Sequence, residues 1–327
     1  MVAALSGVAA LGLSTGTQAV PLYADIVVLV DESASMAGRH TWLANMADSL
    51  EPQLFNAGVT GQNHYGLIGF NSDDAVVDHG LSGSESSGIE FGFAHIHALH
   101  LVSPGTAYGT AQEFSTTGVG GLITSGSAGW DNADGAYAYR AINYALGSGG
   151  TAGQLWRQDS AHNLILVTDW NKEDSDSLPL DTNAIKNALL ATKTVLNAVI
   201  DVDINCADGS SAMGVDATGT GYVANANGAY TTCTGAYVVE DPNLVWSYAD
   251  LALAVGGAVW DLGLLDDSIF EYTADFTQAF VDVKVGEITD NDDGDNGNNG
   301  GTVPEPESLS LLAIGLLGLI AIRRKIH

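Results

Sequence analysis

Asp31, Ser33 and Ser35 form an Asp-x-Ser-x-Ser sequence directly after an apolar run over residues 25–30. A carboxylate and two hydroxyls are hard oxygen ligands, which suit hard divalent cations. Because Mg²⁺ keeps several waters and takes only one or two protein carboxylates, these side chains could hold it and leave a coordination position open. The alternative is that they only cap the next helix, since Asp and Ser are both favoured N-cap residues.

A second carboxylate ends another apolar run. Residues 163–168 read Asn-Leu-Ile-Leu-Val-Thr, and Asp169 follows them. Unbroken apolar runs rich in β-branched residues are typical of parallel strands buried on both faces. Open α/β sheets place their ligands at the carboxyl ends of such strands. Two central strands that each end in an aspartate are a stronger signal than either strand alone.

Helical and strand patterns alternate along the rest of the chain. We expect helices over 43–54, 138–145, 185–192, 243–254 and from near Asp267, and further strands over 65–70, 76–81, 194–202 and 258–261. This order predicts an α/β fold that is doubly wound, with a mainly parallel sheet and helices on both faces. The strand at 25–30 is expected in the middle of that sheet.

These features resemble the von Willebrand factor A (VWA) domain, whose metal-ion-dependent adhesion site (MIDAS) begins with an Asp-x-Ser-x-Ser loop. The resemblance covers roughly residues 23–288 and includes the closing helix, Gly-Gly stop and short strand near Gly256. It implies a Rossmann-like VWA fold and a cation, Mg²⁺ or else Mn²⁺ or Ca²⁺, held by Asp31, Ser33 and Ser35. Asp169 would be the remaining site residue, held through water.

Two positions depart from the VWA pattern. The Thr that many VWA domains place before the helix at 138–145 is absent, and an acidic segment with Asp131 and Asp134 stands there. The resemblance implies that Asp131 or Asp134 substitutes as a ligand, and the alternative is that both only cap the helix. Trp170 follows Asp169 where the family often has Gly, and it could offer an aromatic contact on the binding face.

Two Gly-, Ser- and Thr-rich segments, near 82–129 and 206–240, are expected as insertions in the domain. In the first, His95 and His97 would lie on one face of a strand and could bind a soft metal, although partly exposed surface histidines are the ordinary outcome. The second is bracketed by Cys206 and Cys233, the two cysteines of the chain. In an oxidising compartment such a pair usually forms a disulfide, here across a surface loop, and the alternative is two unpaired thiols.

The two ends of the chain indicate export. Residues 1–19 have the apolar centre and small-residue end of a secretory signal peptide. Residues 289–302 are expected as a flexible acidic linker. Residues 303–327 combine Pro-Glu-Pro, an apolar run and Arg-Arg-Lys, and they resemble the PEP-CTERM sorting signal. That resemblance implies a transient anchor in the inner membrane of a Gram-negative bacterium and processing by an exosortase-type enzyme; a permanent transmembrane tail is the competing interpretation.

The chain has 10 Lys and Arg against 39 Asp and Glu, for a net charge of −29. Such a field repels nucleic acid and anionic membranes and favours divalent cations. We therefore predict an exported adhesion protein of the cell surface or extracellular matrix that engages a carboxylate of a protein or matrix ligand. The alternative is a structural matrix protein with a degenerate metal site. An exported hydrolase is disfavoured because no His-Glu-x-x-His or P-loop sequence occurs, and the Gly-x-Ser-x-Gly match at residues 12–16 lies inside the expected signal peptide.

Overall fold

The computed structural model describes residues 23–36, 38–70, 97–122, 137–147, 155–169, 182–225, 229–239, 246–265 and 270–290. The helices of at least eight residues are α1 (His40–Asn56), α3 (Tyr137–Ala145), α4 (Thr182–Ala191), α5 (Trp246–Ala254) and α6 (Phe270–Asp290). A short α2 (Ala111–Glu113) and helical turns η1 (Ala34–Met36), η2 (Phe114–Gly118), η3 (Val119–Gly121) and η5 (Leu262–Leu265) complete the described helical segments.

Within the described residues the main sheet has ten strands, and five neighbouring strands at its centre run parallel. In spatial order these are β12 (Ala258–Asp261), β6 (Thr194–Ile200), β5 (Ala161–Thr168), β1 (Ala24–Asp31) and β2 (His64–Phe70). The short strands β3 (His97–Leu99) and β4 (Tyr108–Gly109) pair antiparallel with β2. The mainly parallel α/β fold predicted from the sequence is therefore confirmed.

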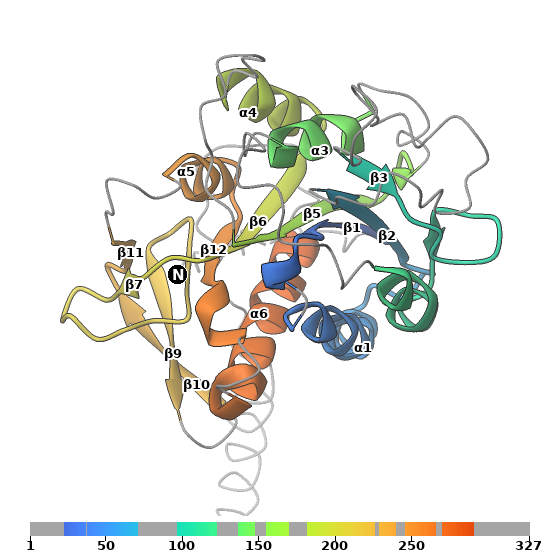
Figure 1. Ribbon diagram of the computed structural model, residues 1–327. Helices are drawn as coiled ribbons and strands as arrows, with labels where there is room; N and C mark the ends of the chain where they lie inside the picture. The colour runs from blue at the N-terminus through green and yellow to red at the C-terminus, as the bar shows by residue number, and fades with distance from the viewer. Residues whose placement is uncertain are drawn as a thin grey trace, which may run out of the picture.

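Helices cover both faces of this sheet (Figure 1). Side chains of β1 alternate between two cores: Ile26, Val28 and Val30 belong to the core that contains residues of α1 and α6. Val27 and Leu29 belong to the core that contains residues of α3, α4 and α5. All eight residues of β1 are buried. A strand with apolar cover on both faces needs an unbroken apolar sequence, and residues 26–30 provide it.

The direction of winding reverses between β1 and β5. From β1 the chain passes to β2 on one side of it, whereas β5, β6 and β12 follow on the other side. In open α/β sheets such a reversal leaves a crevice outside the carboxyl ends of the two strands. Asp31 ends β1 and Asp169 follows β5, so both carboxylates flank this point.

The segment near 206–240 is more ordered than the predicted surface loop. It contains β8 (Gly214–Asp216), β9 (Thr220–Asn225) and β10 (Ala229–Thr234), which extend the main sheet antiparallel beyond β12 (Figure 1). A separate pair, β7 (Ile204–Asn205) and β11 (Tyr237–Val238), closes its base. These strands are short and rich in small residues and threonines, so their sequence shows neither a helical pattern nor a strong apolar one. The predicted disulfide between Cys206 and Cys233 is confirmed.

Several predicted features lie outside the described residues: the signal peptide at 1–19, the strand at 76–81, the linker beyond 290 and the sorting tail. Within the described residues α6 continues to Asp290, two residues into the segment predicted as a linker. The helices of this described part include none that is both long and apolar enough to cross a membrane.

Candidate functional site

Asp31 stands at the carboxyl end of β1 with its side chain fully buried. Its Oδ1 accepts a hydrogen bond from the backbone N–H of Ser33 at 2.9 Å. Its Oδ2 accepts one from Oγ1 of Thr168, on the neighbouring strand β5, at 2.7 Å. The Asp31 carboxylate is thus fixed between its own loop and β5.

The two serines of the loop lie on the solvent side of Asp31. The hydroxyls of Ser33 and Ser35 are 3.1 Å apart, and Ser35 is exposed while Ser33 is half-buried. The backbone N–H of Met36 donates to the Ser33 carbonyl at 3.0 Å, which closes the turn η1 and holds both hydroxyls on it. The Asp-x-Ser-x-Ser sequence therefore presents a run of oxygen atoms from buried to exposed.

Burial disfavours the charged form of Asp31 and raises the pKa of its carboxyl to about 6. The hydrogen bonds from Thr168 and Ser33 oppose this shift, and the nearby charge of Asp169 adds to it. Two neighbouring carboxylates in a poorly solvated place repel each other. A cation between them would remove that repulsion.

Asp169 is held by a cation of the chain itself. Nη1 of Arg39 lies 2.9 Å from Oδ2 of Asp169, and the two side chains are only 15% and 13% exposed. The other carboxylate oxygen, Oδ1, is buried and has no hydrogen-bond partner among the described residues. Asp169 therefore presents one satisfied oxygen and one unsatisfied oxygen at the strand ends.

Three further buried polar side chains, His40, Glu32 and His100, lie in the loop or beside it. Nε2 of His40 donates to the Asp31 carbonyl at 2.9 Å, and burial lowers the pKa of this histidine. Glu32 is fully buried beside His100, with Oε1 3.2 Å from Nε2. A Cβ on Gly69 would collide with the Glu32 carboxylate, so only glycine leaves room for this pair.

Aspartates also mark the next two parallel strands. Asp261 ends β12 and Asp201 follows β6, and the register places Asp261 opposite Ile200. Burial raises the pKa of Asp261 to about 7, and the charges of Asp201 and Asp203 add to the shift. The hydrogen bond from the Gly263 N–H and the charge of Arg39 oppose it. Four of the five central parallel strands, β1, β5, β6 and β12, therefore end in an aspartate or are followed directly by one.

The structure brings four of the six predicted ligands to one edge: Asp31, Ser33, Ser35 and Asp169. Asp131 and Asp134 lie outside the described residues, as do Trp170 and His95, so their predicted roles stay predictions. His97 lies on β3, and its side chain is outside the description.

Sequence reasoning missed Thr168 and Arg39. The available signals were the position of Thr168 directly before the strand-end aspartate and the scarcity of cations in so acidic a chain.

The donor set fits a hard divalent cation. Carboxylate and hydroxyl oxygens are the ligands that Mg²⁺, Mn²⁺ and Ca²⁺ prefer, and the orphaned Oδ1 of Asp169 is a spare acceptor beside them. Within the ranges that the structure describes, no group of three or more His, Cys, Asp and Glu side chains could hold a metal ion. A site here would depend on the serine hydroxyls and on water, as is usual for Mg²⁺.

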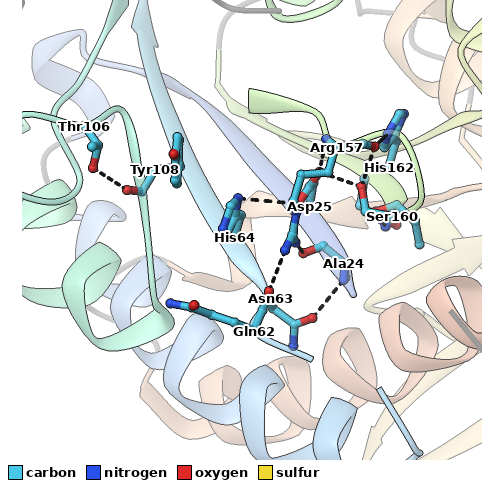
Figure 2. A network of polar contacts seen from close by, with 12 residues as sticks. Ala24, Asp25, Gln62, Asn63, His64, Thr106, Tyr108, Arg157, Ser160 and His162 are labelled. Atoms are coloured by element: carbon cyan, nitrogen blue, oxygen red, sulfur yellow. Dashed lines mark hydrogen bonds and ion pairs between the residues drawn. The ribbon is translucent and has the colours of Figure 1, made fainter. Parts of the chain in front are cut away.

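A second polar network lies at the opposite, amino-terminal edge of the sheet (Figure 2). The fully buried carboxylate of Asp25 accepts hydrogen bonds from the backbone N–H and from Nε of Arg157, at 2.6 and 2.7 Å, and from Oγ of Ser160 at 2.5 Å. Nη1 of Arg157 donates to the Gln62 carbonyl at 2.8 Å. These contacts tie the segment before β5 to the start of β1 and the turn before β2. Its main charges, Asp25 and Arg157, are paired with each other, and we expect the network to stabilise the fold.

Residues 302–325 match the model of the PEP-CTERM protein-sorting motif. This confirms the sorting tail predicted over 303–327 and implies export and processing by an exosortase-type enzyme. No curated protein matches the chain.

Among solved structures, three of proximal thread matrix protein 1 from the mussel byssus are similar over 56% of this chain, with 16–17% identity and TM-scores of 0.33, 0.28 and 0.30. The chain spans 38–39% of that protein, and one of the three structures has a zinc-occupied MIDAS motif. Similarity this low carries no weight for function, and the fold rests on the strand order described above.

Proposed function

We propose that this chain is an exported VWA-type binding protein that holds a divalent cation through Asp31, Ser33 and Ser35 and engages a carboxylate of a partner. The observation that carries the proposal is the placement of Asp31 and Asp169 at the strand ends that flank the change of winding, where α/β sheets bind ligands. A bound cation would supply a Lewis-acidic point that accepts a partner's carboxylate oxygen.

Each residue of the candidate site has a distinct role in this proposal. Thr168 and the Ser33 backbone orient the Asp31 carboxylate, and the Ser33 and Ser35 hydroxyls extend the oxygen surface toward solvent. Asp169 adds negative charge from β5. Mg²⁺ is the preferred candidate because the donors are few, hard and partly exposed, with Mn²⁺ and Ca²⁺ as substitutes. The role is binding rather than catalysis.

The sorting motif gives the setting. An exosortase-type enzyme would act at the tail while the inner membrane holds it transiently, and the acidic body would work at the cell surface or in the extracellular matrix of a Gram-negative bacterium. The chain's net charge of −29 disfavours contact with anionic lipids and nucleic acid.

A structural matrix protein whose site binds no metal is the second candidate. The ion pair between Arg39 and Asp169 favours it, since the guanidinium already neutralises one of the site's carboxylates. The two candidates differ in whether attachment to the matrix depends on a divalent cation.

The test is retention of the full-length chain in the matrix of an exosortase-bearing host. We expect EDTA to release the wild type, Mg²⁺ to restore attachment, and Asp31→Asn to be released without chelator. Asp208→Asn, on the exposed turn between β7 and β8, makes the same charge change and should behave as wild type. Retention that ignores both EDTA and Asp31→Asn would contradict the proposal and support the structural candidate.

A further inference from the structure

Arg39 occupies an unusual place for a cation. It immediately precedes α1 as the N-cap residue, and its side chain makes no capping hydrogen bond. Helix N-termini carry a partial positive charge and favour Ser, Thr, Asp or Asn, so a cation there is locally unfavourable. A contact outside the helix must therefore stabilise the guanidinium at this position.

That contact is the ion pair with Asp169. The Nη1–Oδ2 distance of 2.9 Å joins residues 130 positions apart, and both side chains are more than four-fifths buried. Nη1 also lies 3.8 Å from Sδ of Met36, in the turn η1 that also contains Ser35. Arg39 thus lies between the Asp-x-Ser-x-Ser loop and the end of β5. A positive charge there lies close to the oxygen atoms that a cation would use.

We propose that Arg39 is an internal counter-ion that competes with the divalent cation for Asp169, so that cation binding requires the guanidinium to leave that carboxylate. This inference rests on the proposed cation site. Among the described residues, Oδ1 of Asp169 has no hydrogen-bond partner, so a cation could use it, but that cation would share one carboxylate with the guanidinium at Oδ2. The guanidinium neutralises the edge when no cation is bound, and it repels a cation that enters.

The consequence is a low affinity of the site for the divalent cation. Asp31 and Asp169 without Arg39 would present two uncompensated carboxylates to a cation, whereas the guanidinium of Arg39 reduces the negative charge of the group by one. The site would then fill only where the divalent cation is abundant. Attachment to a partner would follow the external cation concentration.

The test is calorimetric titration of MnCl₂ and MgCl₂ into purified full-length protein. We expect Arg39→Gln to bind about tenfold more tightly than wild type, because it removes the charge and keeps a polar side chain. Arg39→Lys keeps the charge and should remain weak. Lys193→Gln makes the same change in net charge at an exposed residue before β6, at the opposite edge of the sheet, and should match wild type.

The outcomes separate this inference from the proposed function. A wild type that binds as tightly as Arg39→Gln overturns the competition and leaves the cation site standing. Binding by Arg39→Gln alone supports the competition and contradicts a cation-dependent function of the native chain. Absence of binding in every protein contradicts both.

A second readout on the wild type guards against misfolding of Arg39→Gln. The side-chain ¹⁵N signals of Arg39, assigned by their loss in Arg39→Lys, should shift when MgCl₂ is added, as the guanidinium leaves Asp169. Signals that do not move up to saturating MgCl₂ overturn the inference.

Discussion

Thr168 donates its hydroxyl to Asp31 across two neighbouring parallel strands, with 2.7 Å between Oγ1 and Oδ2. Both side chains are buried, at 1% and 0% exposure. This bond lowers the pKa of Asp31 against the opposing effect of burial. It is the contact from β5 that keeps the carboxylate oriented and closer to its ionised form.

Replacing Thr168 by Val removes this donor with little change of shape. We expect Thr168→Val to lower the free energy of unfolding by about 1–3 kcal/mol at neutral pH, because one carboxylate oxygen loses a buried donor. Urea unfolding measures the change. Thr231→Val, on the exposed strand β10, is the matched control and should differ from wild type by less than about 0.5 kcal/mol. Equal effects of the two variants would refute the role of Thr168.

The ion pair between Asp25 and Arg157, at the amino-terminal edge of the sheet, is expected to contribute strongly to the free energy of unfolding. Arg157→Met leaves the buried Asp25 carboxylate without its guanidinium partner, and we expect a loss of about 3–5 kcal/mol. Lys186→Met on α4 is the control of equal charge change. If chemical denaturation shows less than about 1 kcal/mol between the two variants, the pair is not structural.

Reduction of the disulfide should destabilise the antiparallel extension. Cys206 and Cys233 are 27 positions apart, and the chain-entropy model gives about 3–4 kcal/mol for a closed loop of this size. The double variant Cys206→Ala/Cys233→Ala isolates this effect without reductant. Hydrogen exchange should accelerate most in β8, β9 and β10, and uniform acceleration through β1 and β5 would argue against a local role.

Asp261 gives a pH dependence whose sign follows from its raised pKa of about 7. The unfolded chain ionises this group near 3.8, whereas the folded chain holds the proton up to about 7. Its contribution to stability is therefore full below about pH 4 and is lost as the pH rises toward 7.

Asp261→Asn keeps an acceptor for the Gly263 N–H but cannot ionise. We expect this variant to be more stable than wild type by about 1–2 kcal/mol at pH 8, since partial exposure reduces the full effect, and equal to it at pH 4. Thermal unfolding at both values measures the difference. A gain of the same size at pH 4 would mean that ionisation is not its cause.

Much of the parallel core was predictable because each helix and strand has its own hydrophobic periodicity in the sequence. The apolar runs at β1 and β5 and the helical spacing in α1 gave element type and approximate bounds, since a strand with two covered faces needs an unbroken apolar sequence. The antiparallel extension was not predictable in the same way. Residues such as Thr231 and Thr232 lie in the exposed strand β10, where no core imposes an apolar alternation.

The residues of the candidate site also differ in how far the sequence predicts them. Asp31 and Asp169 were predictable because both follow buried strands, and strand ends meet at one edge in a parallel sheet. Arg39 was not, because its contact to Asp169 spans 130 residues and depends on where α1 begins. A long-range ion pair leaves no local pattern in the sequence.

The most direct test of the cation site is the stoichiometry of MnCl₂ binding to full-length wild type and Asp31→Asn at about 0.15 M salt, where weak attraction to the acidic surface is screened. We predict one Asp31-dependent cation per chain in the wild type, with an affinity weakened by Arg39 to about the millimolar range, and its loss in Asp31→Asn. Identical isotherms for the two proteins would contradict the account, because the bound cations would then belong to the diffuse charge of the surface.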